Sequence, residues 1–543
     1  MDSKDIGNSE DLEFGGYSKE QHISTLENVD TSDGQAVVEK DPDSLNAGLH
    51  RGLKDRHMSM IAIGKPVHLL DLLLSAGPGG ALVAWSLIGL LVYAVSQAMG
   101  EMATAIPVAS SWTVFAGRFI DPSIGFAVSW SYWFNIITGL ASELIAAANV
   151  VAYWNDVKRT NLGYVNRLLG GSTSPEYARF CLIKVITIIV FIIIGICVIS
   201  GGIGGVVYGV KYFGTDVGGG PFKDGFVGVL NVLINAVFSY GGFQNMTLLA
   251  GEAKDPHKTI PKAVNKVWIR ILLFYIVSIF CMCCLVSQTD PRLLSPDHSV
   301  VESPFTIAFQ KTGVSAAASI LNAVILTSIL SAGNSNMYSG SRILLSLVRS
   351  DMGPSFAKKY ITLTNRWGVP YVAVFLTSIG SCVCFVTGIV GNGVVLTWLI
   401  ALSGVTTMIA WASITFGAYR FRRAWSAQGR AQSELLYRAP GYPYMHISST
   451  ALNIIMLLIQ GWSSFSPFNV SSFFSAYVSV LFFVILFAYH KIANKTKWVK
   501  LTEMDLDTDY FHPPPEQDDL DDTEQKNIPK WRAWMTRVSG WIM

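Results

Sequence analysis

Residues 227–250 read VGVLNVLINAVFSYGGFQNMTLLA, an apolar run that contains two adjacent glycines, Gly241 and Gly242. A helix needs about 20 apolar residues to cross a hydrocarbon core of about 30 Å, and this run is long enough. Glycine has no side chain to restrict its backbone, so paired glycines weaken a helix and favour unwinding. The stretch therefore predicts a membrane helix that is broken within the bilayer.

Apolar runs of this kind recur along the chain. The 543 residues are 51% hydrophobic and 14% charged, with a mean hydropathy of +0.40, whereas soluble domains carry about 25% charged residues. The sequence predicts an all-α, polytopic membrane protein. Ten spans are expected, at about 79–99, 124–152, 180–200, 227–250, 269–289, 315–349, 371–391, 394–418, 448–466 and 471–490. An eleventh run, 58–74, is a poor candidate because it contains charged and helix-breaking residues, which are costly in a membrane helix.

Basic residues gather in alternate loops, after the spans that end at 250, 349, 418 and 490. Loops rich in Lys and Arg stay in the cytoplasm, so these loops and both termini are expected there. This orientation requires one more crossing between 153 and 180. That segment is too charged for a membrane helix, so either one span is inverted or a crossing helix is missing. The segment contains Asp156, Lys158, Arg159, Asn166, Arg167, Glu176 and Arg179.

The two ends of the chain are polar. Residues 1–50 are acidic and lack the apolar core of a secretory signal, so a disordered cytoplasmic tail is expected. Residues 494–543 are expected to form a second disordered cytoplasmic tail, whose final Trp and basic residues either lie along the membrane surface or dock loosely. The segment between them, 51–493, is the expected membrane domain.

Other chemistries find little support in the sequence. The seven cysteines lie in or beside apolar runs, and no His or carboxylate accompanies Cys281, Cys283 and Cys284, so no metal site is expected. The glycine-rich stretch 201–205 follows a membrane helix and not a strand, which argues against a nucleotide loop. We expect no cofactor, no nucleic-acid partner and no enzymatic activity.

Several motifs occur in a characteristic order. They are RHMSMIAIG at 56–64, AGPGG at 76–80, GEMAT at 100–104, GEAKDP at 251–256 with Ile260-Pro261, LSAGNS at 330–335 and YRFRR at 419–423. In these motifs the chain resembles the fungal amino-acid permeases, the yeast amino acid transporter family of the amino acid–polyamine–organocation superfamily. The resemblance covers roughly residues 51–505, and makes 51–493 a transporter domain.

The resemblance implies twelve helices, of which the first ten form two inverted five-helix repeats with the first and sixth helices broken at mid-membrane. It implies proton-driven uptake of amino acids at the plasma membrane, and ubiquitin ligases or endocytic adaptors that act on tail lysines such as Lys4, Lys19 and Lys40. Two departures stand out: the first helix is altered and shortened over 64–75, and the fourth helix is absent from 154–180. Losses this abrupt suggest altered splicing or a faulty gene model.

A zwitterion held at mid-membrane needs partners for its carboxylate and its ammonium, and broken helices offer backbone groups for both. The resemblance supports this interpretation for the glycine pair, although close packing of two helices through small residues is the alternative. Tyr240 and Phe243 are then expected to bound the side-chain pocket, and Gln244 stands where the family often has Glu. The full set of expected substrate-binding residues is Ser239, Tyr240, Gly241, Gly242, Phe243, Gln244 and, in the first helix, Gly64.

Four further residues are expected to couple transport to protons. By resemblance to proton-coupled members, the protonation of Lys184 replaces a bound sodium ion, with Ser331 and Asn334 facing the same region. The alternative is that Lys184, near its helix end, extends to the cytoplasmic surface. Glu143 lies deep in its span and must be paired or protonated, which suggests a structural or gating role. Glu101, at the inner end of its helix, is expected at the membrane interface.

The sequence thus favours a proton-coupled amino-acid permease, a symporter whose partners are an amino acid, protons and the bilayer. Two alternatives stay open. One is a sensor that binds amino acids without transporting them, which the altered first helix and Gln244 favour over a generic permease. The other is an inactive splice or gene-model variant.

Overall fold

The computed structural model describes residues 70–151, 174–203, 205–248, 250, 255–290, 315–365, 369–386, 392–465 and 468–511. Within these ranges every regular element is a helix, apart from one isolated β-bridge between Phe465 and Phe468. The all-α prediction is therefore confirmed for the described part of the chain. The altered first helix and the missing fourth helix fall largely on residues outside it.

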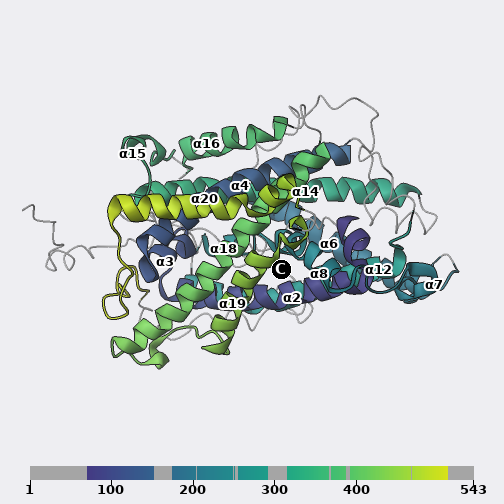
Figure 1. Cartoon of the computed structure of the whole chain (residues 1–543), viewed down its shortest axis with the longest axis horizontal. Coiled ribbons are helices and arrows are strands. Elements are labelled where there is room, and N and C mark those ends of the chain that lie inside the picture. The colour runs from purple at the N-terminus through teal and green to yellow at the C-terminus, as the bar shows by residue number, and fades with distance from the viewer. Residues whose placement is uncertain are drawn as a thin grey trace, which may run out of the picture. The chain divides into compact units, whose positions relative to one another are not determined.

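Each of the ten predicted spans contains helix (Figure 1). The long helices are α2 (Leu70–Ala105), α4 (Pro122–Val151), α6 (Ser174–Ile199), α8 (Gly225–Tyr240), α14 (Ser315–Arg349), α18 (Asn392–Ala427), α19 (Tyr444–Ile459) and α20 (Val470–Asn494). A continuous run joins α10 (Pro256–Asn265), α11 (Val267–Arg270), the π-helix η3 (Ile271–Val277) and α12 (Ser278–Leu285). Shorter elements are α3 (Ser111–Phe119), α7 (Thr215–Gly218), α9 (Asn245–Leu248), α15 (Ser355–Ile361), α16 (Tyr371–Ser381), η1 (Lys211–Phe213), η4 (Cys382–Val386), η5 (Gln432–Glu434) and η6 (Trp462–Ser464).

Several of these helices have the character of membrane spans. Five helical stretches of the described chain are long and apolar enough to cross a bilayer: Ser75–Ala105, Gly225–Leu248, Pro256–Leu285, Val395–Ala427 and Val470–Asn494. The last of these is almost entirely exposed along its apolar window, as expected for a helix that faces lipid.

Three helices form the core around the glycine pair. α2, α8 and α18 all pack against one another, and α18 also packs along α4. α2 approaches α8 and η3 closely: a Cβ on Gly89 would lie 3.1 Å from the Tyr240 hydroxyl of α8 and 2.7 Å from Ile271 of η3. α4 in turn packs along α14, and α14 also contacts α9, which follows the glycine pair.

A buried ion pair joins the ends of α2 and α18. Arg422 donates from Nε to Glu101 Oε1 at 2.8 Å and from its terminal nitrogen to Oε2, which also accepts the Ala439 N–H at 2.7 Å. Glu101 is 1% exposed. Arg422 and a backbone N–H compensate the charge of this carboxylate, which is fully enclosed by protein; its expected position at the membrane interface stays a prediction.

Residues 495–511 are ordered against the helix ends, so the expected disorder from Asn494 onward is wrong for this segment. Met504 and Leu506 are buried, and Arg118 Nε donates to the Asp505 carbonyl at 2.8 Å. Burial raises the pKa of the Asp505 carboxyl, but hydrogen bonds from Thr508 and the charge of Arg118 outweigh it and hold that pKa below its usual value. Basic partners thus neutralise acidic side chains of this segment, and two of its apolar side chains are buried against the rest of the protein.

Candidate functional site

The helix break predicted at the glycine pair is present. α8 ends at Tyr240, Gly241 is extended (φ −55°, ψ 143°), and α9 begins at Asn245. Gly242 has φ 104°, a conformation that side chains with a Cβ rarely adopt. No atom lies within 4 Å of the position that a Cβ on Gly242 would take, so a side chain would have room here. The backbone conformation, and not a lack of space, is therefore what requires glycine at this position. A continuous helix packed through small residues is therefore excluded here.

Gln244 holds the break in place. Its Oε1 accepts the Gly242 N–H at 3.2 Å, and its Nε2 donates to the Tyr132 hydroxyl at 2.6 Å. The Tyr132 hydroxyl donates to Asn245 Oδ1 at 3.1 Å. All of these side chains are buried away from water, so their polar groups depend on these hydrogen bonds for partners. The amide uses both its acceptor and its donor, which an ionised carboxylate could not do.

A small cavity lies against the backbone of the break. Gly241 and Gly242 form one wall, and the other walls come from three helices. The lining side chains are Tyr132, Asn135 and Ile136 of α4, Asn336 of α14 and Thr407 of α18. The enclosed space holds roughly one water molecule. The lining combines backbone, amide and hydroxyl groups with one apolar side chain, which suits a small polar ligand.

The lining amides differ in how far they are already engaged. Asn135 Nδ2 donates to Thr407 Oγ1 at 3.1 Å, and Asn135 Oδ1 accepts from the Ser403 hydroxyl. Asn336 is 5% exposed, and its Nδ2 has no hydrogen-bond partner among the described residues. Buried polar groups are nearly always paired, so this donor is the one most available to a bound molecule.

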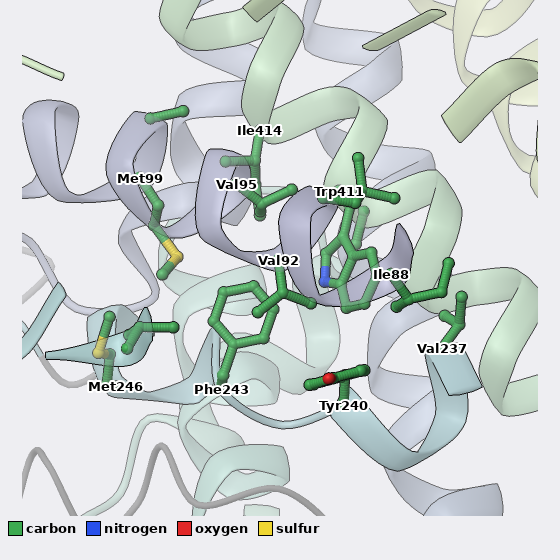
Figure 2. Close-up of a cluster of buried hydrophobic side chains, with 14 of the residues drawn as sticks. Ile88, Val92, Val95, Met99, Val237, Tyr240, Phe243, Met246, Trp411 and Ile414 are labelled. Atoms are coloured by element: carbon green, nitrogen blue, oxygen red, sulfur yellow. The ribbon is translucent and has the colours of Figure 1, made fainter. Parts of the chain in front are cut away.

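Tyr240 and Phe243, expected to bound a side-chain pocket, do not line this cavity. Figure 2 shows them among the apolar side chains of α2 and α18, including Ile88, Val92 and Trp411. The Tyr240 hydroxyl donates to the Trp85 carbonyl at 3.1 Å, and the Phe243 ring lies 5.5 Å from the Trp411 ring. In this structure both aromatic residues anchor the break to the core.

None of the other predicted site residues whose side chains the structure describes belongs to the cavity lining. The Ser239 hydroxyl donates to the Asn235 carbonyl at 2.8 Å within α8. Ser331 is buried and Asn334 is half-buried in α14, and Glu143 is buried in α4. Lys184 belongs to α6, but its side chain lies outside the described part, as does all of Gly64.

Four polar lining residues were not predicted: Tyr132, Asn135, Asn336 and Thr407. Each is a polar residue within an apolar span, and this is the one signal the sequence offers for them. The same signal marks many polar residues of these helices that do not line the cavity, so it could not single them out.

The network around Gln244 predicts a stability effect. Gln244→Leu removes the partner of the Gly242 N–H and one of the two partners of the Tyr132 hydroxyl in a buried site, so we expect the free energy of unfolding to fall by about 1–3 kcal/mol. Thermal unfolding of the purified protein in detergent measures it, with Gln432→Leu on the exposed turn η5 as the matched control. Equal melting temperatures for Gln244→Leu and the control would contradict the assigned role.

Comparison with known proteins gives a consistent result. The family model described as "Amino acid permease" matches residues 57–503. The lysine-specific permease LysP of Escherichia coli K12 is 37% identical over 479 residues, covering 84% of this chain and 96% of that protein. The basic amino-acid permease of Saccharomyces cerevisiae is 34% identical over 525 residues, covering 92% and 90%. The general amino-acid permease GAP2 of Candida albicans is 34% identical over 488 residues, covering 86% and 82%. With a family match over most of its length and relatives at this identity, the chain belongs to the amino acid permease family.

Proposed function

We propose that this membrane protein is a secondary transporter that imports amino acids across the plasma membrane together with protons, with both termini in the cytoplasm. Membership of the permease family and relatives named as lysine, basic and general amino-acid permeases support transport of amino acids. Those names do not favour a sensor that binds without transporting. They also support a transporter over an enzyme.

The observation that carries this proposal is the cavity at the broken helix. Backbone at Gly241 and Gly242 forms part of its wall, so peptide dipoles contribute to binding without a fixed charge. An amino acid is a zwitterion, and dipoles of both signs suit it better than one buried ion, whose desolvation is costly. The space in this structure is smaller than an amino acid, so α4, α14 or α18 must move to admit one.

Part of the proposal rests on sequence and family resemblance alone. We propose the inverted-repeat architecture, with an altered first helix and a missing fourth helix, and ubiquitin attachment at Lys4, Lys19 or Lys40. Sequencing the transcript tests the helix losses: a message that encodes this very chain would reject a gene-model artefact, and a longer message would support it.

The binding proposal makes a direct prediction for Asn336. In cells that lack their own amino-acid permeases, Asn336→Ala should raise the KM for uptake of a radiolabelled amino acid by about tenfold, since one hydrogen bond to a charged group is lost. Asn231→Ala, on an exposed face of α8, is the matched control and should behave as wild type. Wild-type protein that accumulates none of a full panel of amino acids would reject the function, and an unchanged KM in Asn336→Ala would remove this residue from the site.

The coupling proposal makes a prediction for Lys184. If its ammonium replaces a bound cation, Lys184→Met should abolish the dependence of uptake on external pH, because methionine has similar length and no titratable group. Initial uptake rates between pH 5 and 8 measure this. A pH profile that matches wild type in shape would show that Lys184 takes no part and extends to the membrane surface.

A further inference from the structure

A second set of buried polar side chains lies outside the cavity, on one face of α19. His446, Ser449 and Asn453 follow a spacing of three and four residues, which places them on the same side of a helix. All three are at most 4% exposed, whereas Ile447, Ile454 and Leu458 are exposed on other faces. Because α19 packs against α18 and α2, the polar face is enclosed by those two helices.

Several polar atoms of this face have no hydrogen-bond partner in the described part of the chain. Both ring nitrogens of His446, the hydroxyl of Ser449 and Oδ1 of Asn453 have no hydrogen-bond partner in the described ranges. A buried polar group without a partner costs about 1–3 kcal/mol. Inside membranes, ionisable groups that bear such a cost usually lie on ion or proton pathways, where ordered water completes their bonds.

At the cytoplasmic end this face meets the buried ion pair. The centroid of the His446 ring lies 5.3 Å from that of the Tyr442 ring, and the Arg422 guanidinium lies over the Tyr442 ring, 4.5 Å from its centroid. Arg422 is paired with Glu101 of α2. The imidazole therefore lies close to the end of the helices where a proton would be released.

At the opposite end the same interface approaches the helix break. The Thr415 and Thr450 hydroxyls are 2.7 Å apart and join α18 to α19 at mid-length. One turn further along α18, the indole N–H of Trp411 is buried without a partner in the described residues, and its ring packs on Phe243, next to Gly242. α18 thus contacts α19 at Thr415, the helix break at Trp411 and Glu101 at Arg422.

We propose that His446 carries protons along this interface, on a hydrated route between the helix break and the cytoplasm that Ser449 and Asn453 line. This rests on the proposed proton coupling. The free imidazole nitrogen accepts a proton, the other nitrogen gives up its own, and no other covalent bond changes. Histidine suits this step because one ring nitrogen can accept a proton while the other releases one.

The charged surroundings favour passage of a proton over its storage. The titratable groups around His446 are Arg422, Arg423 and Tyr419 of α18, Glu101 of α2 and Tyr442 just before α19. α20 reaches α19 at the far end, where the Tyr477 hydroxyl donates to the Leu458 carbonyl. Because Glu101 is already bound to Arg422, no described carboxylate is left to hold an imidazolium at this place.

The test separates proton movement from substrate movement. Purified protein in liposomes is assayed for uptake driven by a pH gradient, and for exchange of the same radiolabelled amino acid without a gradient. His446→Leu and His446→Gln should each slow driven uptake about fivefold or more, because general acid–base function is lost, and leave exchange within about twofold of wild type. His490→Gln, on a half-buried histidine of α20, is the control and should change neither.

Other results of these assays would support or reject the proton route. Normal driven uptake in His446→Gln would overturn the proposal, because glutamine can replace hydrogen bonds but cannot carry a proton. If both His446 variants also lose exchange, Ser449→Ala and Asn453→Ala decide: slowed driven uptake with normal exchange supports the route, and normal driven uptake rejects it. A wild-type protein that exchanges no amino acid would instead reject the transport function itself.

Discussion

Inside a bilayer every backbone N–H and C=O must find its partner within the protein, and a helix that stops at Tyr240 leaves several of them unpaired. Gln244 meets this constraint. Its amide oxygen accepts the Gly242 N–H, and its amide nitrogen bonds Tyr132, which in turn holds Asn245 at the start of α9. One side chain thereby ties both sides of the break to α4. The cavity depends on this arrangement, because a continuous helix would leave no backbone exposed to it.

The break presents two faces of opposite character. On one face Tyr240 and Phe243 are held in an apolar core with α2 and α18, which fixes where the chain unwinds (Figure 2). On the other face the glycine backbone meets Asn135, Asn336 and Thr407. Anchoring and the proposed binding thus fall to different residues of one short segment, so under this proposal the polar face exchanges ligand while the apolar face keeps the segment in place.

The sequence could predict the helices and the break, because hydropathy reports burial in lipid and a glycine pair reports backbone freedom, both local properties. It could not predict the cavity lining, since Tyr132, Asn336 and Thr407 meet only through the packing of α4, α14 and α18. For the same reason it could not predict that Tyr240 and Phe243 pack into the apolar core and do not line this cavity. The prediction of disorder was wrong for segment 495–511 because the segment is mostly polar and acidic, with only two apolar side chains that become buried. Its basic partners also lie far away in the sequence.

The most direct test of the central claim is the affinity of the purified protein for its transported amino acid after Gly242→Ala. The new methyl group meets no atom within 4 Å, so it acts only on the backbone conformation, at a cost of about 1–3 kcal/mol. Gly417→Ala in α18, whose nearest contact would be 3.8 Å, is the control. We expect equilibrium binding to weaken about tenfold or more in Gly242→Ala, with the control unchanged. Wild-type affinity in Gly242→Ala would contradict the claim that the left-handed glycine conformation forms the substrate site.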